Sequence, residues 1–132
     1  TSSSSRTKIC NYATTAVDIY SRQVSAAGVV APSAAAVITA PGQDFAPRLA
    51  SVASNVARLV YWRFTDDFNR DVVGVDLNAG VVAPAYYISN LATFREFAPT
   101  IACASATNCM VTYRKNGTGT ANADWVVTRN VN

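Results

Sequence analysis

Hydrophobic and polar residues along this chain recur with the two-residue period of β-strands. In residues 56–64 both alternating sets contain aliphatic or aromatic side chains, so this strand is expected to be buried on both faces and to lie centrally. Shorter patterns of the same kind predict further strands at residues 8–12, 16–22, 35–40, 72–77, 85–89, 109–114 and 124–129.

Turn residues separate these segments. Pro32-Ser33, Pro41-Gly42, Asn78-Ala79-Gly80 and Asn116-Gly117 are combinations that favour tight turns. Helical patterns are short and limited to residues 49–55 and 92–97. The fold class predicted is therefore all-β: an antiparallel β-sandwich or barrel of seven or eight short strands, with little helix.

Two sequence words occur twice, at a constant offset of 52 residues. Ala-Gly-Val-Val-Ala-Pro stands at 27–32 and again at 79–84, while Asp-Phe-Ala-Pro at 44–47 matches Glu-Phe-Ala-Pro at 96–99. A fixed offset between separated matches predicts an internal duplicated unit, with copies at about 14–47 and 66–99. Residues 1–7 are expected to form a flexible polar arm, and residues 8–132 a single β-sandwich domain.

The composition narrows the class of function. Half of the 132 residues are hydrophobic and 14% are charged, so much of the surface must consist of small, uncharged residues. Such a surface suits an extracellular protein or an assembling subunit. The net charge of +3 is spread along the chain, which argues against a specific nucleic-acid groove, and no apolar run is long enough for a membrane span.

Three cysteines leave at least one without a partner in the chain. Cys103 and Cys109 flank a short polar loop and are expected to form a local disulfide, which leaves Cys10 as a possible intersubunit thiol. Alternatives are a bridge from Cys10 to one of the other two, or three reduced thiols. Without histidine or a close cysteine pair, no metal site is expected.

The chain lacks the residue type that most often serves in catalysis. The chain has no histidine, so a hydrolase would need paired carboxylates, and the one acidic cluster comprises Asp66, Asp67, Asp71 and Asp76. This acidic loop resembles the start of a calcium-binding loop, but its glycine comes late and its final glutamate is absent. We expect a solvated connection, no enzyme activity and no cofactor.

Aromatic residues offer candidate binding positions. Tyr86, Tyr87, Trp125 and Arg63 are the residue types with which proteins stack on sugars and hydrogen-bond to them, although most rings at strand spacing belong to a core. Asn116 begins an N-glycosylation sequence, and Asn116-Gly117 also reads as a hairpin turn before residues 124–129.

Several segments resemble the thaumatin-like proteins and their smaller fungal relatives. Ile9-Cys10-Asn11 followed by 17–20 resembles their first strands, and the run from Leu77 to Cys103 resembles their central signature. The resemblance implies a secreted β-sandwich and assigns no site residue here.

Two functions follow from these observations. In one, the protein is a non-catalytic secreted binding module of the thaumatin-like kind, which recognises a cell-wall polysaccharide or a host protein surface. In the other, it is a self-assembling structural subunit of a virion coat or extracellular filament, whose partners are copies of itself.

Overall fold

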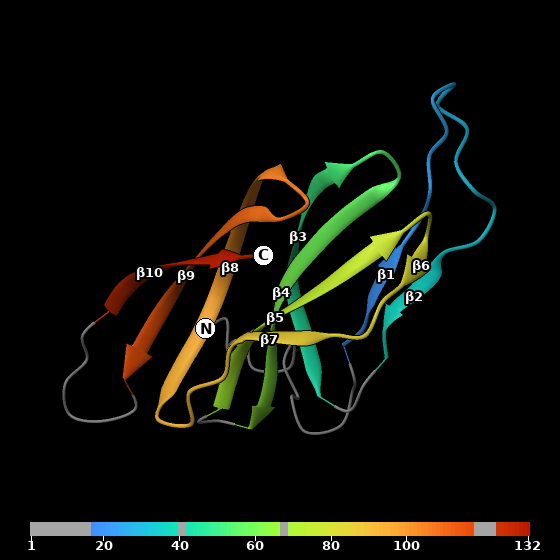
Figure 1. Ribbon diagram of the computed structural model, residues 1–132. Coiled ribbons are helices and arrows are strands. Elements are labelled where there is room, and N and C mark those ends of the chain that lie inside the picture. The colour runs from blue at the N-terminus through green and yellow to red at the C-terminus, as the bar shows by residue number, and fades with distance from the viewer. Residues whose placement is uncertain (1–16, 40–41, 67–68, 118–123) are drawn as a thin grey trace, which may run out of the picture.

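The computed structural model describes residues 17–39, 42–66, 69–117 and 124–132, and these residues form an all-β, sandwich-like fold without helix (Figure 1). Side chains at 35, 65 and 66 lie outside the description. Ten strands follow in order: β1 (Ile19–Ser21), β2 (Ala35–Ile38), β3 (Gln43–Ala53), β4 (Val56–Asp66), β5 (Asn69–Asn78), β6 (Val81–Val82), β7 (Tyr86–Ser89), β8 (Phe94–Ser105), β9 (Asn108–Gly117) and β10 (Asp124–Val131).

One large sheet dominates the fold. Its strand order is β10-β9-β8-β5-β4-β3, and β6 and β7 pair with β5 beside this path. The β1–β2 hairpin forms a separate two-stranded sheet. Named strands pair antiparallel, except where β5 meets β8 through the single parallel pair Arg70 and Arg95. The large sheet curls, so that β3 also lies against β8.

The sequence predicted most strands but missed the longest. Each predicted segment except 8–12, which lies outside the described residues, overlaps an observed strand. The two helical segments were wrong: residues 49–53 belong to β3, and 94–97 begin β8. Ten strands replace the expected seven or eight, and five of them are at least ten residues long.

The Phe-Ala-Pro words explain why β3 and β8 escaped prediction. Proline has no backbone N–H to donate, so within a sheet it is confined to edges and bulges. Ala46 and Ala98, each before a proline, have φ of 50° and 52°. The register shifts at both places, which accommodates the proline in a bulge and lets the strand continue beyond it.

Strand pairing repeats at the offset of the sequence words. Asp44 lies opposite Arg63 in the β3–β4 ladder, and Glu96 lies opposite Lys115 in the β8–β9 ladder. The β1–β2 and β5–β7 ladders share a register shift, after Ile19 and after Val72, although here the equivalent residues are one position away from the 52-residue offset. We call β1–β4 unit 1 and β5–β9 unit 2. β10 then follows β9 as β5 follows β4.

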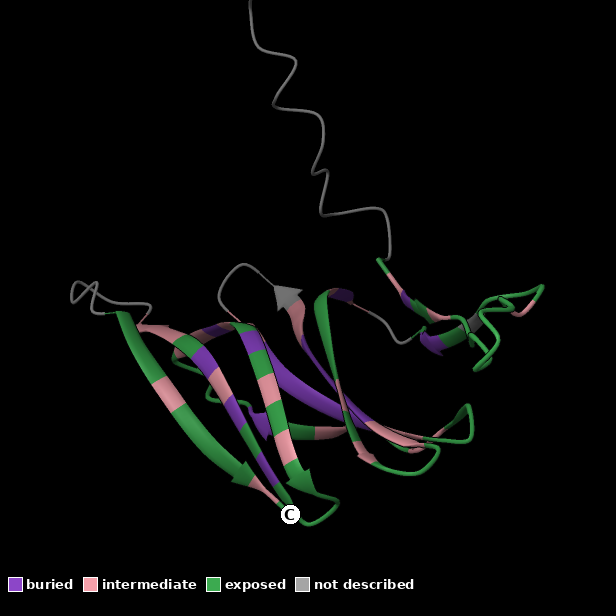
Figure 2. Ribbon diagram, turned by 90° about the horizontal axis from the view of Figure 1, so that it is seen from above, coloured by how far each residue is buried: buried purple, intermediate pink, exposed green. Residues whose placement is uncertain are grey.

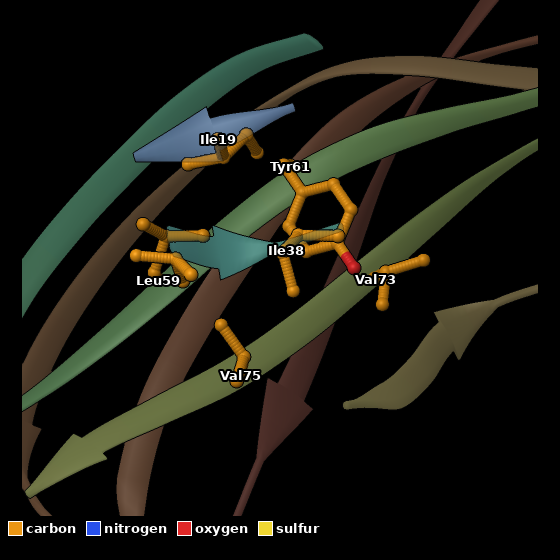
Figure 3. Packing of buried hydrophobic residues seen from close by; sticks show 7 residues of the cluster. Ile19, Ile38, Leu59, Tyr61, Val73 and Val75 are labelled. Atoms are coloured by element: carbon orange, nitrogen blue, oxygen red, sulfur yellow. The ribbon is translucent and has the colours of Figure 1, made fainter. Parts of the chain in front are cut away.

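Two hydrophobic clusters lie on opposite faces of β4 and β5. The unit 1 core, shown in Figure 3, comprises Ile19, Val37, Ile38, Leu59, Tyr61, Val73 and Val75. The unit 2 core comprises Val60, Val72, Ile88, Val111 and Tyr113. Because β4 and β5 contribute to both clusters, the prediction that residues 56–64 form a central strand buried on both faces holds for Leu59, Val60 and Tyr61.

Cys103 and Cys109 join the two strands of the β8–β9 hairpin, with sulfur atoms at the bonding distance of 2.09 Å. The local pairing expected from the sequence is therefore observed. At the equivalent positions of the β3–β4 hairpin stand Ser51 and Ala57, which also lie opposite each other.

Replacing Cys103 and Cys109 with serine is expected to lower the free energy of unfolding by about 2 kcal/mol, because the short closed loop restricts the unfolded chain only modestly. Chemical denaturation of the wild type and the double variant measures this loss. Ser51→Cys with Ala57→Cys is the matched gain-of-bridge variant, and failure of this pair to oxidise would contradict the equivalence of the two hairpins.

Candidate functional site

A buried ion pair fixes Arg63 inside unit 1. Its guanidinium donates from Nε to Asp44 Oδ1 over 2.8 Å and from Nη2 to the hydroxyl of Tyr61 over 3.0 Å. Burial raises the pKa of Asp44, against the opposing effect of Arg63. Burial likewise raises the pKa of Tyr61 to about 12. Arg63, a candidate ligand-binding residue from the sequence, is thus committed to internal contacts.

Unit 2 places another buried carboxyl, Glu96, where unit 1 has Asp44. The Ser89 hydroxyl donates to Glu96 Oε1, and burial raises the pKa of this carboxyl despite that bond. The cation opposite Glu96 contacts an aromatic ring instead, since Lys115 Nζ lies 3.7 Å from the centre of the Phe94 ring. Sequence reasoning missed both carboxyls, although each precedes a repeated Phe-Ala-Pro word.

The described members of the acidic cluster lie on strands. Asp71 and Asp76 lie on β5, where Asp71 is buried and Asp76 forms an ion pair with Arg58 at 2.8 Å. Asp66 ends β4, and Asp67 lies outside the described residues. Within the described part of the chain, no three His, Cys, Asp or Glu side chains gather as metal ligands.

Tyr86 and Tyr87 flank a shallow pocket of about 250 Å³ between β7 and the end of β10. Tyr86 is largely a core residue, because its ring packs so closely on Gly74 that a Cβ there would come within 2.6 Å. Tyr87 is 55% exposed. Arg129 closes the pocket by donating from Nη1 to the carbonyl of Ile88 over 2.8 Å. The other lining residues are Asn130, Val131 and Asn132.

The remaining predicted site residues lie elsewhere. Trp125 is half-exposed near the start of β10 and meets Phe94 edge-on, with ring centres 6.0 Å apart. It lies about 13 Å along the strand from Arg129. Asn116 belongs to β9 rather than to a hairpin turn, and its amide donates to Asp124 Oδ1 over 2.9 Å. Cys10 and residues 1–7 are outside the described residues.

The outer face of β9 and β10 exposes hydrophobic side chains that sequence reasoning did not single out. Val126 is 74% exposed and lies opposite Arg114 in its ladder, just as Val72 lies opposite Trp62 one unit earlier. Val72 is fully buried. We call Met110 and Val126, which lie on the same side of the sheet, the terminal face, whereas Trp125 lies on the opposite side. Most of β10 is exposed (Figure 2).

Met110 shows that the exposed fraction of a side chain depends here on its position in the repeat and not on its residue type. It stands opposite Asn130 as Arg58 stands opposite Asp76, yet Met110 is 49% exposed and the charged Arg58 is 6% exposed. The equivalent side chains, Val72 and Arg58, are covered by other residues of unit 2. Among the described strands, none covers the terminal face.

Comparison with known protein families, with curated proteins and with solved structures gives no match. The resemblance to thaumatin-like proteins therefore stays a prediction. None of the described residues forms a helix that is long and apolar enough to cross a membrane.

Proposed function

We propose that the protein is a non-catalytic structural subunit that self-associates through its terminal face, as in a virion coat or an extracellular filament. The observation behind this proposal is the exposure of Val126 at a position whose equivalent, Val72, is fully buried inside the same chain. The edge of a sheet presents unpaired backbone groups, so an edge strand with an exposed apolar side chain such as Val126 is a template for pairing with another chain.

Composition and architecture favour the same function. A surface with few charges allows close contact between copies at a small desolvation cost. The two units already pack against each other by β-strand pairing, so the fold contains one example of the contact that a further unit would make.

Size-exclusion chromatography with light scattering, over a concentration series with and without reductant, tests self-association. We expect species several times larger than the 14.0 kDa chain, with the larger species growing at higher concentration. A constant mass near 14.0 kDa would contradict the proposal. Loss of the large species only under reducing conditions would point to cysteines, including Cys10, as the subunit link.

A second candidate function is recognition of a polysaccharide or protein surface at the Tyr87 pocket, as in the thaumatin-like reading. The specific observation is the exposed Tyr87 ring beside Arg129 and the polar Asn130 and Asn132. A glycan array would identify a ligand, and Tyr87→Ala should abolish its binding. Tyr20→Ala is the matched control, because Tyr20 is similarly exposed and does not line this pocket.

A further inference from the structure

The last strand of the chain repeats the first in sequence. Residues 19–24 read Ile-Tyr-Ser-Arg-Gln-Val, and residues 126–131 read Val-Val-Thr-Arg-Asn-Val. Five of the six positions hold an identical or chemically similar residue. The match places Val126 at the position of Ile19 and Thr128 at that of Ser21.

Strand pairing leads independently to the same correspondence. Val72 lies opposite Ser89 of β7, and Ile19 lies opposite Ile38 of β2, each directly before a register shift. Val72 is also the unit 2 equivalent of Val126, from the β4–β5 and β9–β10 ladders. β1, β5 and β10 are therefore successive copies of one strand.

Of these three strands, β5 uses both of its edges. One edge pairs with β4, and the other pairs with β6 and β7 and meets β8. Among the described residues, β1 pairs with β2 and has no counterpart of β4, whereas β10 pairs with β9 and has no counterpart of β7. Among the described residues, β1 and β10 thus each pair along one edge, whereas β5 pairs along both.

We infer that β10 of one molecule takes the place of β1 in the next, pairing with β2 there while it stays paired with β9 of its own chain. The inference rests on the proposed self-association and specifies its register. The junction between molecules then reproduces the β4–β5–β7 junction within each molecule, and repetition of the contact gives a linear head-to-tail array.

The side chains of β10 fit both roles. Val127 and Val131 already pack on the unit 2 core of their own chain. Val126 points from the opposite face, because adjacent strand residues alternate, and would replace Ile19 in the unit 1 core of the next molecule. The strand it displaces is short, since β1 has three residues paired with β2.

Val126→Lys separates this contact from folding. The side chain is exposed in the isolated molecule, so the melting temperature should not change, whereas a lysine cannot enter the apolar place of Ile19. We expect association to weaken by at least about 100-fold. Val126→Ile, which copies Ile19, should preserve or strengthen association. Leu91→Lys, an exposed change between β7 and β8, should leave association unchanged.

A cysteine pair tests the register. Val126→Cys and Ile38→Cys are made in separate molecules, both with Cys10→Ser, and are mixed under mild oxidation. In the free molecule Ile38 is 7% exposed and faces Ile19 in the β1–β2 ladder, so a 126–38 disulfide requires β1 to leave. Mass spectrometry of the cross-linked peptide should identify this bond. Val37→Cys, equally buried and one residue out of register, is the control and should not link.

The outcomes distinguish the two proposals. A wild-type protein that stays monomeric overturns both. Assemblies that form without the 126–38 bond, or that survive Val126→Lys, overturn strand replacement and leave self-association standing. A cross-link within one chain between residues 1–16 and the terminal face would overturn both proposals, because self-association is proposed through that face.

Discussion

Replacing Tyr61 or Tyr113 with alanine is expected to lower the free energy of unfolding by about 3–5 kcal/mol in each case. The two tyrosines hold equivalent positions on β4 and β9, and both are almost completely buried. Each is the largest side chain of its core, so truncation removes apolar contacts and leaves a cavity that β-sheet neighbours cannot easily fill. Urea denaturation followed by circular dichroism measures both losses.

Phenylalanine variants provide the control. Tyr113→Phe keeps the ring and should cost little. Tyr61→Phe also removes the hydroxyl that accepts a hydrogen bond from Arg63, so it should cost about 1 kcal/mol. An alanine variant that loses less than about 1 kcal/mol would show that the corresponding cluster is not a tightly packed core.

Arg63→Ala is expected to cost about 3–5 kcal/mol at neutral pH, because it leaves the buried carboxylate of Asp44 without its cation. Burial already raises the pKa of Asp44, and the loss of Arg63 should raise it further. The folded variant then holds this proton to a higher pH than the unfolded chain does. Its stability should accordingly fall as the pH rises above about 4 and recover as the pH is lowered.

Lys115→Ala is the matched control at the equivalent position of unit 2. It should cost about 1 kcal/mol or less, because Lys115 lies over Phe94 while Glu96 is hydrogen-bonded by Ser89. Denaturation of both variants between pH 4 and pH 8 tests the comparison. Equal costs, or a flat pH profile for Arg63→Ala, would show that Asp44 does not depend on its buried partner.

Alternation alone was sufficient to predict the strands whose faces differ regularly in polarity, such as β9, and the central strand β4. It failed for β3 and β8, because Ala-Pro looks like a strand terminator unless a bulge accommodates it. The repeated words indicated a duplication but did not reveal how far it extends. The pairing shows that it continues through β4 and β9, where the two sequences have diverged.

Candidate sites were predictable only in part. The spacing of Cys103 and Cys109 was enough to predict their bridge, and the exposure of Tyr87 follows from strand alternation beside the half-buried Tyr86. Arg63 was not predictable as a core residue, since its partner Asp44 is distant in sequence. The terminal face could not be predicted without the strand pairing. The exposure of Val126 becomes informative only when it is compared with the burial of Val72 at the equivalent position.

The strand β5 belongs to both cores at once, which has an evolutionary consequence. A segment that ends with β4 would lack Val73 and Val75, and its core would remain open on one side. We therefore expect the smallest module that can fold and be duplicated to be one unit together with the first strand of the next. A gene for such a protein can grow by whole increments of about 52 residues, as in other repeat architectures, each new copy closing the core before it.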